Sequence, residues 1–155
     1  MATRSAGLLM WRRRPEGIEV FLVHPGGPFW ATRDEGAWSI PKGEYAEGEQ
    51  PLEAARREFR EETGLSVEGE YVPLEPVRQK GGKTVMAWAV EGDCEAAAVS
   101  SNTFEMEWPP RSGRRQEFPE IDRAAWFPLD EAAAKILKGQ LPLLEQLVQL
   151  LRREE

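Results

Sequence analysis

The sequence predicts an α/β domain, because segments of strand-like composition are combined with two amphipathic helical patterns. The strand-like segments are rich in aliphatic, β-branched and aromatic residues, and lie at 5–11, 18–23, 84–90 and 124–127. The helical patterns cover 51–63 and 141–151, each with a proline in its first turn. A chain of 155 residues can bury a sizeable core, and we expect one domain over residues 1–155.

The composition argues against several classes of function. A net charge of −7 provides no electrostatic basis for non-specific binding to nucleic acid or to an anionic membrane. The single cysteine, Cys94, excludes an internal disulfide, and the single histidine, His24, argues against a His-rich zinc site. The apolar run at 7–11 is too short for a signal peptide or a membrane span, so we expect a cytoplasmic protein.

The N-terminal third predicts a hairpin followed by an irregular stretch. An Arg-rich turn at 12–17 connects the first two strands, and we interpret His24 as a structural residue at the end of the second. Phe29 and Trp30 follow without a clear period. Two adjacent aromatic residues beside a loop could stack on a nucleobase or lie in the core, and both interpretations remain open. A further short strand is predicted at 37–40.

The most informative stretch is Gly43–Leu65, GEYAEGEQPLEAARREFREETGL. On a helix over 51–63, at about 100° per residue, three carboxylates lie in one arc of roughly 100°: Glu58, Glu61 and Glu62. Ala54 falls in the same arc, and a stripe through Phe59 should face the core. Like charges at this spacing repel, whereas hard divalent cations bind oxygen ligands. The pattern therefore indicates a metal site, with a solvated acidic face as the alternative.

The complete spacing resembles the Nudix box of the Nudix hydrolases. Its fixed positions are occupied by Gly43, Glu49, Arg57-Glu58, Glu61-Glu62 and Gly64, and the one departure is Phe59, where the family usually has an aliphatic residue. The resemblance implies a Nudix fold, in which a mixed β-sheet is sandwiched between helices in an α/β/α arrangement. It also implies Mg²⁺, with Mn²⁺ as an alternative, and hydrolysis of a phosphoanhydride bond in a nucleoside diphosphate linked to another group.

The resemblance also assigns roles within the box. It implies that the metal ligands are Gly43, through its carbonyl, and Glu58, Glu61 and Glu62. Arg57 is expected to orient a box carboxylate, and Glu49 to pair with Arg57 or join the metal shell. The general base is expected to be a box glutamate or a later glutamate, for which we select Glu120 over Glu117.

Residues flanking the box predict the substrate contacts. The segment Trp38-x-x-Pro41-Lys42-Gly43 resembles Nudix members that hydrolyse diadenosine polyphosphates, and these or NTPs lead the expected substrates. Lys42 and Lys83 are expected to contact phosphates, although a solvated turn also explains such lysines. Trp38 and Trp30 are candidates for stacking on a base.

The C-terminal half is expected to contain a strand at 103–108, a basic loop at 109–116 and two helices. Asp130 is the predicted N-cap of the first helix and Gly139 its end. The apolar stripe of the last helix suits either the core or a dimer contact, which leaves a monomer and a homodimer open.

Two other functions remain as alternatives. A Nudix-like domain can bind a nucleotide without catalysis, although such domains usually have damaged boxes and this box is intact. Removal of diphosphate from RNA 5′ ends is a second alternative, since the basic loop could contact RNA although the net charge makes a nucleic-acid partner less favourable.

Overall fold

The computed structural model describes residues 4–153, and its centre is strand β1 (Arg4–Arg14). Residues 5–11 are all buried, because apolar side chains point to both faces of the sheet at this strand. Strand β2 (Gly17–Pro25) pairs antiparallel with β1, and β6 (Thr84–Glu91) pairs parallel with it. The predicted first hairpin is therefore confirmed, with longer strands than the sequence indicated.

The seven-stranded mixed sheet has the main order β4-β6-β1-β2-β9, where β4 is Val72–Pro73 and β9 is Ile121–Pro128. Two short strands, β3 (Lys42–Glu44) and β5 (Val77–Arg78), pair with β1 and β6 respectively. The strand predicted at 37–40 forms only isolated bridges, one between Ser39 and Val23 and one between Trp38 and Ile136. The next segment, β3, pairs with β1 and brings the start of the box next to that strand.

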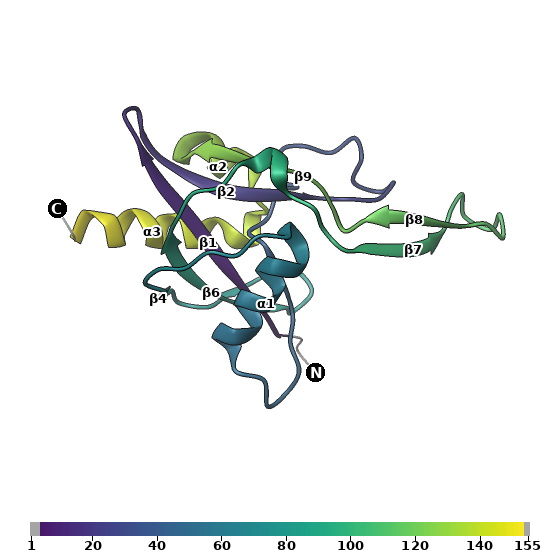
Figure 1. Ribbon diagram of the computed structural model, residues 1–155, viewed down its shortest axis with the longest axis horizontal. Coiled ribbons are helices and arrows are strands. Elements are labelled where there is room, and N and C mark those ends of the chain that lie inside the picture. Colours follow the sequence, from purple (N-terminus) through teal and green to yellow (C-terminus); the bar gives the residue numbers. More distant parts are fainter. Residues whose placement is uncertain (1–3, 154–155) are drawn as a thin grey trace.

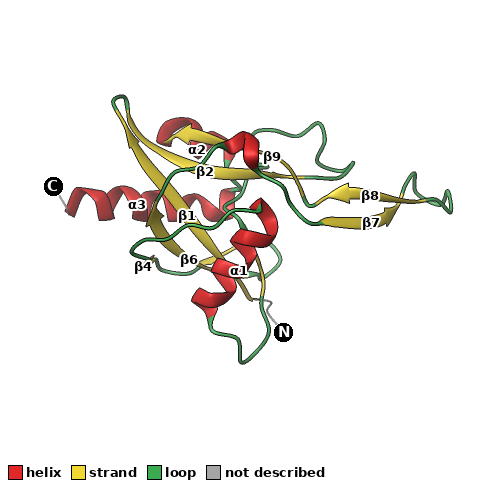
Figure 2. Cartoon of the chain, in the orientation of Figure 1, coloured by secondary structure: helices red, strands yellow, loops and turns green. Residues whose placement is uncertain are grey.

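Helices cover both faces of this sheet (Figures 1 and 2). Helix α1 (Pro51–Thr63) has the predicted bounds, and Gly64 ends it in the left-handed region with φ of 73°. Its residues Ala54, Ala55 and Phe59 pack against one face of the sheet. Ala54, which falls in the same arc of the helix as the three carboxylates, is therefore a core residue.

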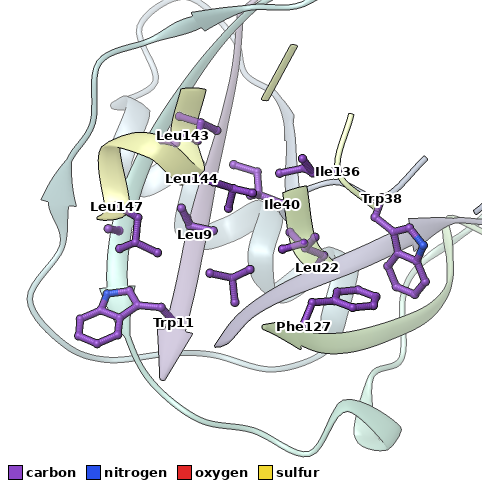
Figure 3. Packing of buried hydrophobic residues seen from close by; sticks show 14 of the residues in the cluster. Leu9, Trp11, Leu22, Trp38, Ile40, Phe127, Ile136, Leu143, Leu144 and Leu147 are labelled. Carbon is purple, nitrogen blue, oxygen red and sulfur yellow. The ribbon is translucent and has the colours of Figure 1, made fainter. Parts of the chain in front are cut away.

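The opposite face is covered by α2 (Leu129–Lys135) and α3 (Leu141–Arg153). Figure 3 shows side chains of α3 packed against β1 and β2. The apolar stripe of α3 is buried in this core, where it contributes Leu143, Leu144, Leu147 and Leu151.

The predicted limits of α2 are wrong at both ends. Pro128 occupies the N-cap position, and the Asp130 carboxylate accepts a hydrogen bond only from the next backbone N–H, that of Glu131, at 2.9 Å. The helix ends at Lys135, because the chain becomes extended at Ile136, whose side chain is buried in the core. Gly139 lies in a separate 3₁₀ turn, η2 (Lys138–Gln140).

A second, two-stranded sheet projects from the body as a hairpin of β7 (Thr103–Glu107) and β8 (Arg115–Pro119) (Figure 1). The basic loop forms the connection at its far end, so its arginines lie away from α1. A 3₁₀ turn, η1 (Ala96–Ala98), precedes the hairpin. Within residues 4–153, no helix has the length and apolar character needed to cross a membrane.

Candidate active site

Arg57 holds the carboxylates of the box together on the exposed side of α1. Its Nη1 donates to Glu58 Oε1 at 2.8 Å and to Glu61 Oε2 at 3.2 Å. The other atoms of the guanidinium face Glu49, with Nε to Oε2 at 2.9 Å and Nη2 to Oε1 at 3.2 Å. The hydrogen bonds to Glu49 are the main reason that the pKa of Arg57 is raised, and the same contact lowers the pKa of Glu49. Arg57 and Glu49 are thus paired, as one of the two predictions for Glu49 had it, and the role of Arg57 in orienting a box carboxylate stays a prediction.

Glu58 lies directly against Gly43. A Cβ atom at residue 43 would come within 2.0 Å of Glu58 Oε2, so any larger residue there would displace the carboxylate. Partial burial raises the pKa of Glu58, although Arg57 opposes the shift, and the charge of Glu61 adds to it. Gly43 is thus required on steric grounds, because only glycine leaves room for the Glu58 carboxylate in this position.

Glu62 lies one helical turn after Glu58, and its carboxylate contacts the start of β3. The backbone N–H of Lys42 donates to its Oε1 at 3.1 Å. Burial nevertheless raises the pKa of Glu62 to about 8, and the charges of Glu58 and Glu120 contribute to this shift. Burial also lowers the pKa of Lys42, and the nearby charge of Lys83 acts in the same direction.

Glu120 reaches the same region from the short connection between β8 and β9. Its backbone N–H donates to Asn102 O at 2.8 Å, and its carbonyl accepts from Gly26 N at 2.8 Å. Burial and the charge of Glu61 raise the pKa of Glu120. These interactions bring Glu120 close to the carboxylates of α1, whereas Glu117 lies in the exposed hairpin opposite Glu105.

A pocket of about 190 Å³ opens beside these carboxylates. Four of the predicted site residues line it, one from each of four separate segments: Trp30, Lys42, Glu62 and Glu120. The remaining walls are mainly apolar and come from β2, from the segment before the box, from the first residue of β9 and from the chain just after α2. They are Val23, Pro25, Ala37, Ser39, Ile121 and Leu137. A mostly apolar pocket with a few convergent polar and charged groups is typical of a site for a small molecule.

The structure corrects the prediction for Trp38. Its side chain is only 4% exposed and packs edge-on against Phe127, with ring centroids 4.9 Å apart (Figure 3). Its indole N–H donates to Asp34 Oδ1 at 2.8 Å, so Trp38 anchors a loop from within the core and has no free face for a base. Trp30 is partly exposed in the pocket, and its neighbour Phe29 is 63% exposed.

The donor set of this site fits a divalent metal ion. Its ligands would be the oxygens of Glu58, Glu61 and Glu62, and burial and mutual repulsion disfavour the ionised form of two of them, Glu58 and Glu62. A cation would relieve that cost. Across residues 4–153 no three acidic, His or Cys side chains already converge on one point. Mg²⁺ does not need such a cage, because it usually keeps several waters and binds one or two carboxylates together with substrate phosphates.

Fold and site together define an α/β protein with an acidic, metal-compatible helix beside a small-molecule pocket. A comparison with protein families identifies the group: residues 1–147 match the model for the NUDIX domain, and the chain belongs to that family. The Nudix box and the α/β/α arrangement predicted from the sequence are thereby confirmed. Nudix hydrolases generally use divalent metal cations.

Two relatives of the chain are named as phosphate-hydrolysing enzymes. The chain is 35% identical to the mouse (Mus musculus) bis(5′-nucleosyl)-tetraphosphatase [asymmetrical] over 103 residues, which cover 59% of this chain and 66% of that protein. It thus spans slightly less than two thirds of that relative. It is 31% identical to an RNA pyrophosphohydrolase of Brucella anthropi over an alignment covering 87% of each chain.

Solved structures of low sequence identity share the fold. An Ap4A hydrolase of C. elegans, solved as a binary complex, superposes with a TM-score of 0.67 at 22% identity, covering 97% of this chain and 98% of the other. The NUDIX domain of Shewanella oneidensis NrtR, solved with ADP ribose, gives a TM-score of 0.68 at 16% identity, with 97% and 89% covered.

Sequence reasoning missed the apolar walls of the pocket. Ala37, Ile121 and Leu137 are ordinary hydrophobic residues whose neighbours in space are far away in the chain. It also missed that His24, interpreted only as a structural residue, contacts two of the segments that form this pocket. No local pattern marks either feature, since both depend on how β2, β9 and the loop between β2 and β3 come together.

Proposed function

We propose that this protein is a Mg²⁺-dependent hydrolase of a phosphoanhydride bond in a nucleoside diphosphate linked to another group, with dinucleoside polyphosphates as the leading substrates. The observation that supports this most strongly is the pocket in which Trp30, Lys42, Glu62 and Glu120 meet beside the box carboxylates. The names of the mouse and C. elegans relatives favour dinucleoside polyphosphates over other nucleotides.

The proposed metal ligands are Glu58, Glu61 and Glu62, together with the carbonyl of Gly43. When bound, the metal lowers the pKa of a water molecule and neutralises phosphate charge. Arg57 keeps Glu58 and Glu61 in position through its hydrogen bonds to both. Each of these roles concerns placement of oxygen atoms, which is most of what an enzyme contributes to phosphoryl transfer.

Glu120 is the proposed general base. Its raised pKa makes it a stronger base than an ordinary glutamate, and it lines the pocket together with Glu62. Lys42 and Lys83 are proposed to bind phosphate oxygens, since their mutual repulsion would be relieved by an anion. Trp30 is proposed to stack on the nucleobase.

The test is a panel of substrates assayed for released phosphate and nucleotides. It includes diadenosine tetraphosphate, ATP, an oxidised dGTP, ADP-ribose and 5′-triphosphorylated RNA, each with Mg²⁺, with EDTA, and with Glu61→Gln. We expect Mg²⁺-dependent cleavage of the dinucleotide that EDTA abolishes and Glu61→Gln reduces by at least about 100-fold, the scale of losing a transition-state contact. Binding of nucleotides without turnover of any substrate would contradict hydrolysis and support the non-catalytic alternative.

RNA 5′-end hydrolysis is the second candidate, because the similarity to the Brucella RNA pyrophosphohydrolase extends over most of both chains. The same panel separates the two. Preferred cleavage of triphosphorylated RNA, with release of diphosphate, would replace the dinucleotide assignment while leaving the catalytic residues unchanged.

A further inference from the structure

His24 is the only histidine of the chain, and it is completely buried at the end of β2. Its Nε2 lies 2.6 Å from the carbonyl oxygen of Arg33, and its Nδ1 lies 2.8 Å from Asp122 Oδ1. Its ring also packs edge-on against Trp38, with centroids 5.2 Å apart. A buried polar ring satisfied at both nitrogens holds three segments of the chain in fixed relation.

The partners of His24 determine where its hydrogens are. A carbonyl oxygen can only accept a hydrogen bond, so Nε2 carries a hydrogen and donates it to Arg33 O. The second contact also needs a hydrogen, carried either by Nδ1 or by the Asp122 carboxyl. The Nε2 donor is therefore independent of how the proton between the other two groups is shared.

Each partner of His24 belongs to a segment that forms a wall of the pocket. Arg33 is in the loop at 26–36, where its N–H donates to Trp30 O at 3.0 Å and its guanidinium lies 5.6 Å from the Trp30 ring. Asp122 follows Glu120 and Ile121, which line the pocket on the other side. His24 thus connects the loop carrying Trp30 with the strand that begins beside Glu120.

The segment around Glu120 and the loop at 26–36 differ in the contacts that hold them besides the one to His24. Glu120 has its own backbone hydrogen bonds to Asn102 and Gly26, each at 2.8 Å. The loop at 26–36 is bonded to other segments near its two ends, by Gly26 to Glu120 O at the start and by Asp34, which accepts from Trp38 and Lys135, near the end. Between these ends, the ring of Phe29 packs edge-on against Trp108, and the Arg33 carbonyl accepts the hydrogen bond from His24. Among the hydrogen bonds from the loop to other segments, the one at Arg33 is nearest in the chain to Trp30.

We propose that His24 is a positioning residue for substrate binding, which fixes Trp30 in the pocket through the hydrogen bond from Nε2 to the Arg33 carbonyl. It touches neither substrate nor metal. The inference deepens the proposed function, since it rests on Trp30 contacting the nucleotide. Its expected signature is a change in KM with little change in kcat, because the loop affects binding and not the carboxylates.

Two substitutions separate the two contacts of the ring. The amide nitrogen of glutamine reaches about as far as Nε2, so His24→Gln can still donate to Arg33, whereas the shorter asparagine in His24→Asn reaches only the Nδ1 position. We expect His24→Asn to raise the KM of the best dinucleotide substrate at least fivefold with kcat within twofold, and His24→Gln to restore most of the loss. Tyr71→Phe serves as control, because it removes a 2.6 Å hydrogen bond to Val67 O away from the pocket.

Backbone hydrogen exchange gives a readout that needs no substrate. His24→Asn should speed exchange of the Trp30–Gly36 amides at least tenfold, His24→Gln much less, and Tyr71→Phe not at all. Because His24 is the sole histidine, ¹⁵N spectra of the wild type should also show Nε2 protonated. Equal exchange and equal KM in His24→Asn and His24→Gln would overturn the proposal. If no substrate is turned over, the exchange result still decides whether His24 anchors the loop.

Discussion

Helix α1 and the loop at 26–36 line the same region, but their site residues are held by different kinds of contact. On α1, Arg57 binds Glu58 and Glu61, and Gly64 ends the helix, all within eight positions of the chain. The loop is held at Arg33 by His24, nine positions earlier in the chain, and at Asp34 by Lys135, 101 positions later. His24 in turn contacts Asp122, 98 positions away. The proposed metal site is thus built mostly within one segment of the chain, where it is recognisable as a motif, whereas the position of Trp30 depends on contacts that form only when distant segments come together.

Substitution of Arg57 tests the arrangement of the carboxylates on α1 and should have the largest effect on turnover. Arg57→Lys keeps the charge but cannot contact Glu49, Glu58 and Glu61 together, since lysine lacks the planar fork. We expect kcat to fall by about 100-fold with the metal-free protein still folded, because small displacements of catalytic oxygens are costly. Steady-state kinetics and thermal unfolding check this. Arg56→Lys, one position away and paired with Glu68, is the matched control and should stay within twofold of wild type.

The pH dependence of the stability of the metal-free protein tests whether Glu62 is protonated in the folded state. Its pKa is about 8 in the folded protein and close to 4.5 when unfolded, so the folded state holds the extra proton between these values. Stability from this group is present below about pH 4.5 and is lost as pH rises through 8. We therefore expect the Tm of the EDTA-treated protein to fall between about pH 5 and pH 8, and Mg²⁺ to raise it most at the alkaline end of this range.

Glu62→Gln provides the control for this pH dependence, because glutamine cannot ionise. The variant should lose most of the decrease in Tm between about pH 5 and pH 8 and most of the response to Mg²⁺. A Tm that falls equally in wild type and variant would assign the pH dependence to other groups.

Substitutions of two tryptophans test the pocket wall formed by the loop at 26–36, and their effects should be smaller. One substitution should change KM and the other the stability of the fold. Trp30→Ala should raise KM by about tenfold with little loss of stability, since stacking on a base contributes about 1–3 kcal/mol. Trp38→Phe should leave KM nearly unchanged but destabilise the fold by about 1 kcal/mol, because it loses the hydrogen bond to Asp34 while keeping most of the packing against Phe127. Substrate kinetics and urea unfolding of both variants decide the assignment. A KM increase for Trp38→Phe and none for Trp30→Ala would reverse it.

The same division explains which predictions from the sequence succeeded. Helix α1 has its predicted bounds because proline, an amphipathic face and a terminal glycine act within one segment. Glu120 was selected by family resemblance and lies near Glu61 and Glu62, and its role as general base stays a prediction. The resemblance also suggested Trp38, which is buried because its ring packs with Phe127 and His24, a contact that no local pattern reveals. The helix end predicted at Gly139 failed for the same reason, since burial of Ile136 ends α2 earlier. The cap predicted at Asp130 failed because the helix already begins at Leu129, with Pro128 at the N-cap position.

The central claim is that the carboxylates of α1 bind a divalent ion required for hydrolysis, and calorimetric titration of Mn²⁺ into the wild type and Glu58→Gln tests it most directly. Mn²⁺ is a suitable probe because it binds the same oxygen ligands as Mg²⁺. The account predicts binding to the wild type that Glu58→Gln weakens at least tenfold, with turnover of the dinucleotide at limiting metal falling in parallel. Equal Mn²⁺ affinity in both proteins, or undiminished turnover in EDTA, would contradict it.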